Sequence, residues 1–377
     1  MKKIFVLTGE PSGDKLASKV ITELIKTNNK IEFLSVGGDH IKSLGIKSIY
    51  DLKNITYLGF TNVLLNIFKI KKNINKAVDK IVEFNPNILF SVDSPDFTLR
   101  VAKLVKKKNP RIKIIHFVAP QVWIWRPGRV KKIKNSIDHL LLLFNFEKIF
   151  FDKEGIKSTF VGHPLLDKND AVNENLITLD QSDKKIISLF PGSRISEIKS
   201  LMPVLTEFIT LVQKKTNKYS YFFHCTKEYH NYVRNYLLKK NLKDCEAISD
   251  LDTKKNILIK TFFAIVKSGT ISLEISNAQV PSLIVYKMNF INFFIIKLLV
   301  NTKYANIFNI ISKTEIIPEL LQTNCNAAKI YKVFSSFALN PELSRDQLLR
   351  CNKILKNIKN NNSSTKTISD ILSKNLS

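Results

Sequence analysis

The residues KIFVLTGEPSGDKLASKVITELIK at positions 3–26 determine how the chain begins to fold. Residues 4–7 form a short, unbroken apolar run, which is the pattern of a strand buried on both faces of a sheet. Two glycines in residues 9–14 permit a tight turn, and from residue 14 to 26 the apolar side chains recur with helical spacing. A buried strand, a glycine turn and a helix are the repeating unit of a parallel α/β sheet.

This unit recurs along the whole chain. In the first half we expect strands at 4–7, 31–36, 88–92, 112–117 and 158–161, with helices at 14–26, 61–83 and 97–107. A polar stretch at 168–184 is typical of a linker. In the second half we expect strands at 186–190, 219–224, 262–266 and 283–286, with helices at 196–214 and 228–238. The sequence therefore predicts an α/β protein of two Rossmann-like, doubly wound parallel-sheet domains facing a cleft.

The predicted boundaries place the N-terminal domain at 1–166 and the C-terminal domain at 167–340. Residues 341–377 are expected to form a C-terminal helix and tail that pack back on the N-terminal domain or cross to the partner in a homodimer. A length of 377 residues suits two domains.

The net charge of +27 comes from 59 Lys and Arg against 32 Asp and Glu. This excess indicates a polyanionic partner, such as nucleic acid, anionic lipid or a phosphorylated substrate, but it also fits an AT-rich coding sequence that favours Lys, Asn and Ile. No recognition-helix or RNP-type motif is present, which argues against nucleic acid. The four cysteines form no CxxC pair, and no apolar stretch reaches ~20 residues, so we expect a cytoplasmic protein without a spanning helix.

Candidate site residues follow the predicted strands of the first domain. The loop after the first strand offers Gly9, Glu10, Ser12, Gly13 and Asp14. This loop is interpreted either as a substrate-side element or as a capped turn in which Ser12 or Asp14 caps the helix.

Two acids follow the strand at 88–92. Asp93, nearer the strand end, is the candidate general base toward a sugar hydroxyl, and Asp96 is expected to cap the next helix.

Both tryptophans lie in the loop after the strand at 112–117. Its candidates are Gln121, Trp123, Trp125 and Arg126. Aromatic side chains beside an arginine suit stacking on a sugar or contact with an acyl chain, although a packed wall between domains explains them equally well. His163 is a candidate for either a ligand contact or a hinge.

The second domain carries two candidate phosphate-binding junctions between a strand and a helix. The first offers Gly192, Ser193 and Arg194, with Glu197 at a spacing suited to orienting Arg194 or to ordinary helix pairing. The second offers Ser268, Gly269 and Thr270, with Glu274 one turn later to accept ribose hydroxyls. Together they indicate a nucleotide-diphosphate site, and a loop at 304–309 adds Asn309 as a further candidate.

The motifs GEPSGD (9–14), SVDSPDF (91–97), APQVWIWR (119–126), VGHPL (161–165), PGSR (191–194), SGTISLE (268–274) and PELLQ (318–322) occur in the order and spacing of the lipid-A-disaccharide synthases. The chain resembles this family over about residues 4–325. It departs from the family at Phe308, where the family usually has proline.

The resemblance implies a GT-B fold and an inverting hexosyl transfer that needs no metal or other cofactor. The donor would be UDP-2,3-diacylglucosamine, the acceptor 2,3-diacylglucosamine 1-phosphate (lipid X), and the products a β-1,6-linked lipid A disaccharide 1-phosphate and UDP. It assigns the base to Asp93, donor contacts to Arg194 and Asn309, and the donor nucleoside to Glu274. The N-terminal domain would be the acceptor side and the C-terminal domain the nucleotide-sugar side.

Acylated substrates imply peripheral contact with an anionic inner-membrane surface at its cytoplasmic face. Residues 57–70 and 288–300 mix large apolar side chains with lysines and suit such contact, although each also fits a buried helix. Another GT-B enzyme, such as a UDP-GlcNAc transferase or epimerase, is the alternative function.

Overall fold

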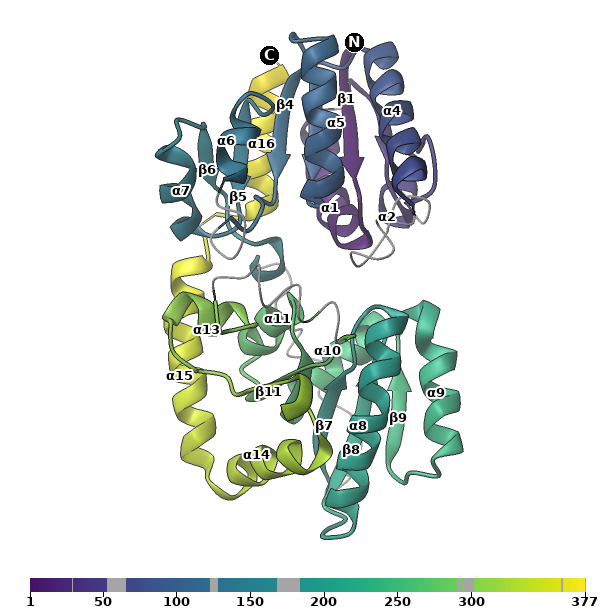
Figure 1. Ribbon diagram of the computed structural model, residues 1–377, viewed down its shortest axis with the longest axis vertical. Helices are drawn as coiled ribbons and strands as arrows, with labels where there is room; N and C mark the ends of the chain where they lie inside the picture. The colour runs from purple at the N-terminus through teal and green to yellow at the C-terminus, as the bar shows by residue number, and fades with distance from the viewer. Residues whose placement is uncertain are drawn as a thin grey trace. The chain divides into compact units, whose positions relative to one another are not determined.

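The computed structural model describes residues 1–28, 30–52, 66–122, 128–167, 184–289, 293, 302–360 and 362–376, and these residues form two compact units (Figure 1). Unit 1 contains the described residues up to 167 together with those from 358 onward. Unit 2 contains the described residues between 184 and 357. The chain therefore returns to unit 1 at its C-terminal end.

Unit 1 is built on a six-stranded sheet in the order β2-β1-β3-β4-β5-β6, with all neighbours parallel. Its strands are β1 (Lys2–Thr8), β2 (Ile31–Val36), β3 (Ile88–Val92), β4 (Lys113–Phe117), β5 (His139–Leu142) and β6 (Ser158–Phe160). Its helices are α1 (Pro11–Thr27), α2 (Asp39–Lys42), α4 (Ile67–Phe84), α5 (Pro95–Lys108), α6 (Arg129–Lys134), α7 (Lys148–Asp152) and α16 (Ser364–Leu376). Short 3-10 turns lie at Asn145–Glu147 and Pro164–Leu166.

Helices cover both faces of this sheet, as the unbroken burial of β3 requires. Helices α4 and α5 pack against each other and share a core with alternate residues of β1, β3 and β4, including Phe5, Leu89 and Ile114. On the other face α1 packs along α16 (Figure 1). The start of α16 is held by Asp167, whose Oδ1 accepts hydrogen bonds from the backbone N–H and hydroxyl of Ser364 at 2.9 and 2.7 Å.

Unit 2 repeats this architecture with the strand order β12-β11-β10-β7-β8-β9, again fully parallel. Its strands are β7 (Lys185–Phe190), β8 (Tyr219–His224), β9 (Cys245–Ile248), β10 (Thr261–Lys267), β11 (Ser282–Tyr286) and β12 (Glu319–Leu321). Its helices are α8 (Ile195–Gln213), α9 (His230–Lys239), α10 (Leu251–Ile259), α11 (Ile271–Asn277), α13 (Ile307–Ser312), α14 (Ala327–Leu339) and α15 (Pro341–Ile358). Short 3-10 turns lie at Lys227–Tyr229 and Gln322–Asn324.

Phe334 of α14 lies in a hydrophobic core of unit 2. Its ring lies 5.5 Å from that of Phe208, 5.2 Å from Tyr219 and 5.6 Å from Phe263, all in edge-to-face contact. Helices α8, α9 and α14 share this core with inward-facing residues of the strands.

The structure confirms the two doubly wound sheets and each strand that the sequence predicts. Three strands were missed: β5, β9 and β12, which are three or four residues long. The predicted linker falls almost entirely at 168–183, outside the described residues. Among the helices that the described residues form, none is both long and apolar enough to cross a membrane.

Candidate functional site

In unit 1 the chain reverses its direction of strand addition between β1 and β3, because β2 follows β1 on one side and β3 lies on the other. Ligands of open α/β sheets bind beyond the strand ends at such a switch point. The loops after β1 and β3 meet there: the hydroxyl of Ser12 donates to Asp93 Oδ2 at 3.1 Å. The structure thus brings the first predicted loop next to the candidate base.

Asp93 lies in a strained turn that directs it out of the sheet. Its φ is 57° and that of Ser94 is 46°, both in the left-handed region that residues other than glycine seldom adopt. The N–H of Asp93 donates to the carbonyl of Phe117 at 2.9 Å, and its carbonyl accepts from the hydroxyl of Thr98 at 2.7 Å. With Asp93 Oδ1 accepting the N–H of Ser94 at 2.8 Å, the carboxylate is fixed in position but only half-buried.

Glycine is required where the two loops touch. A Cβ at Gly13 would lie 2.9 Å from the carbonyl oxygen of Val92, and one at Gly9 would lie 2.5 Å from the Cβ of Ser94. These contacts hold the start of α1 directly against the end of β3.

Asp14 has a different position from the one its sequence suggests. Helix α1 begins at Pro11 with Glu10 as its N-cap, so Asp14 lies inside the first turn, where it is buried. Its carboxylate accepts the N–H groups of Gly38 at 2.6 Å and His40 at 2.9 Å. The alternative in which Ser12 or Asp14 caps α1 is therefore wrong, and Asp14 instead fixes the loop after β2.

The expected capping role of Asp96 is also wrong. Helix α5 begins at Pro95 with Ser94 as its N-cap, which places Asp96 in the first turn.

The tryptophan loop begins at the end of β4. Val118 has a φ of 72°, and Gln121 is exposed. The predictions for Trp123, Trp125 and Arg126 fall at 123–127, outside the described residues.

A buried histidine supports the strand ends of unit 1. Nδ1 of His116, on β4, lies 2.8 Å from the hydroxyl of Ser91 on β3, and burial lowers the pKa of His116 to about 4. The ring is therefore neutral at pH 7, and it links the two strands just before Asp93.

His163 has a structural role in its own turn. Its Nδ1 accepts the N–H of Leu165 at 3.2 Å, and burial lowers its pKa to about 4.

In unit 2 the corresponding switch point lies between β7 and β10. The loop at 191–194 follows β7, and the loop at 268–270 follows β10, so both predicted phosphate junctions lie at neighbouring strand ends. Gly192 has a φ of 115°, and a Cβ there would lie 2.5 Å from Glu197 Oε2. Only glycine allows this turn to close over the first turn of α8.

Glu197 is the centre of this loop. Its Oε2 accepts the N–H of Ser193 at 3.2 Å, and its Oε1 lies 3.5 Å from Arg194 Nη1 and 2.7 Å from Lys267 Nζ. The Arg194 contact is an (i,i+3) pair at the outer limit of a hydrogen bond, so it fits both orientation of Arg194 and ordinary helix pairing, and Lys267 is the closer partner of Glu197. The predictions missed Lys267, although its position as the last residue of β10 could have indicated it.

The ring of Tyr286, at the end of β11, completes this cluster. Lys267 Nζ lies 5.1 Å from the ring centroid. Burial, followed by the negative charge of Glu197, raises the pKa of Tyr286.

His224 supports the same strand ends in unit 2. Its ring stacks on Phe190 at 4.2 Å between centroids, and its Nε2 lies 3.0 Å from the hydroxyl of Ser188. Burial lowers its pKa to about 3, so this imidazole is also neutral at pH 7.

The loop at 304–309 is tied to the second junction. The hydroxyl of Ser268 donates to the carbonyl of Ala305 at 2.7 Å, and the carboxylate of Glu319 accepts the N–H groups of Ala305 and Asn306 at 2.8 and 2.9 Å. Gly269 and Thr270 are exposed and Glu274 is half-buried.

Asn309 is completely buried, and its side-chain hydrogen bonds lie within unit 2. Its Nδ2 donates to Ile317 O and Glu319 Oε1, both at 2.7 Å, and its Oδ1 accepts from the N–H groups of Ile316 and Ile317 at 2.7 and 3.0 Å. Asn309 thus holds the loop in place, and its contact with a donor stays a prediction. The buried Phe308 anchors the same loop, at the position where the family usually has proline.

Comparisons with known proteins agree with this architecture. The UDP-GlcNAc 2-epimerase from Neisseria meningitidis bound to UDP-GlcNAc superposes with a TM-score of 0.67, at 14% identity over 99% of this chain and 100% of that one. MurG of Acinetobacter baumannii gives 0.58 at 11% identity, over 99% and 100%. With its two parallel-sheet units, the chain has the GT-B fold of glycosyltransferases.

Sequence comparison gives the family. A family model described as lipid-A-disaccharide synthetase matches residues 4–371. The lipid-A-disaccharide synthase of Rickettsia felis is 34% identical over 366 residues, which are 95% of this chain and 92% of the relative. The chain belongs to the lipid-A-disaccharide synthetase family and is a glycosyltransferase.

The contact between Gly13 and β3 gives a testable prediction. Gly13→Ala should lower the free energy of unfolding of unit 1 by about 1–3 kcal/mol, because the new methyl group meets a backbone carbonyl that cannot move aside. The matched control is Gly128→Ala, since a Cβ at Gly128 meets nothing within 4 Å. The effect of each substitution can be measured by hydrogen exchange of the β1 and β3 amides. Equal protection of these amides in the two variants would contradict the prediction.

Proposed function

We propose that the chain transfers 2,3-diacylglucosamine from UDP-2,3-diacylglucosamine to the 6-hydroxyl of lipid X. The acceptor oxygen forms a bond to C1 of the donor sugar, the bond from C1 to the UDP oxygen breaks, and configuration inverts. The observation that carries this proposal is membership of the lipid-A-disaccharide synthetase family across residues 4–371.

Asp93 is assigned the role of general base that takes the proton of the 6-hydroxyl. Its carboxylate is held by Ser12 and by the N–H of Ser94 but stays half-buried, so it is both positioned and accessible. Unit 1 is thereby the proposed acceptor side.

The departing UDP is assigned to unit 2. The guanidinium of Arg194 and the N-terminal end of the 19-residue helix α8 are suited to the diphosphate, since the start of the helix adds a positive dipole end. Ser268, Gly269 and Thr270 are assigned to the same nucleotide, and Glu274 to its ribose hydroxyls. These groups stabilise the charge that develops on UDP.

The reaction itself is the first test. Purified protein incubated with UDP-2,3-diacylglucosamine and lipid X should yield the disaccharide 1-phosphate and UDP in equal amounts by mass spectrometry, with and without EDTA. Release of UDP or epimerised sugar from non-acylated UDP-GlcNAc, without a disaccharide product, would instead favour the epimerase or transferase alternative.

The base assignment gives a second test. Asp93→Asn should lower kcat by about 10²–10⁴, the usual contribution of a general base, while UDP binds within about threefold of wild type. The matched control is Asp96→Asn, an exposed acid in the first turn of α5, which should keep near-normal kcat. Loss of UDP binding in a folded Asp93→Asn protein would rule out the assignment.

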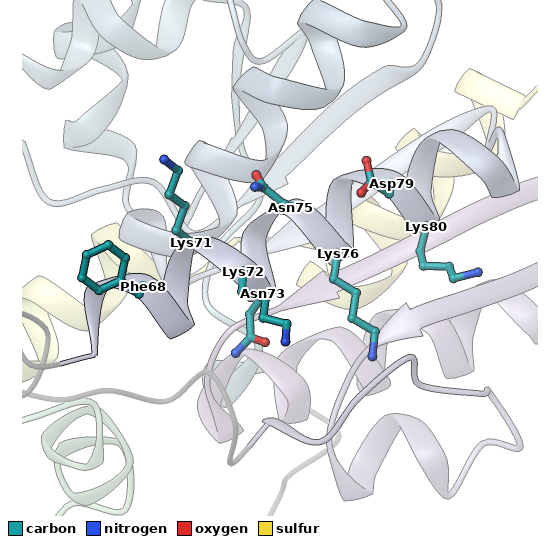
Figure 2. Close-up of a pocket in the computed structure, with 8 residues that line it drawn as sticks. All are labelled: Phe68, Lys71, Lys72, Asn73, Asn75, Lys76, Asp79 and Lys80. Carbon is teal, nitrogen blue, oxygen red and sulfur yellow. The ribbon is translucent and has the colours of Figure 1, made fainter.

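Contact with an anionic membrane surface at its cytoplasmic face is also part of the proposal. Figure 2 shows the exposed side of α4, where an open hollow is lined by Phe68, Lys71, Lys72 and Lys76 among others. Phe68 is 86% exposed, and the first ten residues of the helix carry four lysines and no acid. An apolar side chain flanked by lysines is the pattern of a helix that lies on anionic lipid. The other expected segment, 288–300, lies largely outside the described residues.

Vesicle co-sedimentation tests this surface. The variant Phe68→Ser/Lys71→Gln/Lys72→Gln should bind phosphatidylglycerol vesicles roughly tenfold or more weakly than wild type, because each lysine near such a surface contributes about 1 kcal/mol. The control Leu238→Ser/Lys239→Gln/Lys240→Gln likewise removes one exposed apolar side chain and two lysines, from the C-terminal end of α9. Equal losses in both variants would mean that general charge, and not α4, drives binding.

A further inference from the structure

Lys267 occupies the central position among the strand ends of unit 2. Strand β10 lies between β7 and β11, and Lys267 is its last residue. Its side chain is only 16% exposed, and it is placed between the carboxylate of Glu197 and the ring of Tyr286. A lysine this well covered needs a partner for its charge, and Glu197, itself 13% exposed, supplies it at 2.7 Å.

The two cations near Glu197 are held unequally. The 2.7 Å contact from Lys267 is a close, charge-assisted hydrogen bond, whereas the 3.5 Å contact from Arg194 lies at the outer limit of one. Arg194 has a side chain 39% exposed, more than twice the value for Lys267. The charge of Glu197 is therefore neutralised mainly by Lys267.

The close pairing of Lys267 with Glu197 matters because the carboxylate of Glu197 is fixed beside the loop at 191–194. A Cβ on Gly192 would meet its carboxylate, and Ser193 donates its N–H to it. Were Lys267 absent, an uncompensated carboxylate would remain at this place. It would draw the guanidinium of Arg194 toward itself and repel a bound diphosphate.

We propose that Lys267 is a positioning residue of the donor site: by neutralising Glu197, it leaves Arg194 for the phosphates of the nucleotide sugar. This inference rests on the proposed assignment of UDP to unit 2. The cation acts through Glu197 and Arg194 and does not itself contact the phosphates.

Isothermal titration of UDP into the full-length protein tests the inference. Lys267→Met should weaken UDP binding roughly tenfold or more, the size of one interaction within a charge network. Removing the unpaired carboxylate as well, in Lys267→Met/Glu197→Gln, should restore the Kd to within about threefold of wild type. Lys267→Arg keeps the positive charge and should also bind normally, which guards against a variant that simply fails to fold.

Two further variants separate this role from simpler ones. Lys185→Met removes a lysine that lies over the ring of Phe262 at 4.6 Å, at the opposite end of the same sheet, and should leave the Kd unchanged. In an Arg194→Ala/Glu197→Gln background, Lys267→Met should have no more than about a threefold effect, because neither a carboxylate to neutralise nor a guanidinium to divert remains.

The outcomes are distinguishable. A folded wild-type protein that binds no UDP overturns the donor-site assignment and this inference with it. Normal UDP binding by Lys267→Met overturns the inference alone, as does a double variant no better than the single one. A full loss on Lys267→Met in the Arg194→Ala/Glu197→Gln background also overturns it, because the lysine would then contact the phosphates directly.

Discussion

Parallel pairing of strands buried on both faces is the constraint on which the rest of the molecule depends. Two neighbouring parallel strands can be joined only by a crossover connection, which is usually a helix. That helix then covers one face of the sheet. All neighbours in both sheets are parallel, so all the strand carboxyl ends of one unit meet at the same edge. The loops that carry the candidate site residues of each unit therefore lie at that same edge of its sheet.

Each unit places its loops where its strand order switches, between β1 and β3 and between β7 and β10. Beneath them, each unit also holds a serine and a neutral histidine on neighbouring strands, Ser91 with His116 and Ser188 with His224. Because these imidazoles are buried and uncharged, they add rigidity to the strand ends without adding charge to the sites above them.

The two edges differ in their electrostatics. In unit 1 the carboxylate of Asp93 accepts hydrogen bonds from the hydroxyl of Ser12 and the backbone N–H of Ser94. In unit 2 a carboxylate is surrounded by Lys267, Arg194 and a helix N-terminus. An accessible carboxylate suits a base, and a cluster with excess positive charge suits a departing diphosphate, which agrees with the roles proposed for the two units.

The sequence by itself determined the fold, because unbroken apolar runs alternating with amphipathic helices are compatible with little other than two parallel sheets. It also determined which loops carry chemistry, since glycines and polar side chains follow predicted strand ends. Only the tertiary structure decided what each side chain does there. Asp14 accepts N–H groups from 24 and 26 residues away, and Lys267 pairs with Glu197 across the β7–β10 switch point. Local patterns carry no information about such partners, because they are brought together only when the strands pair.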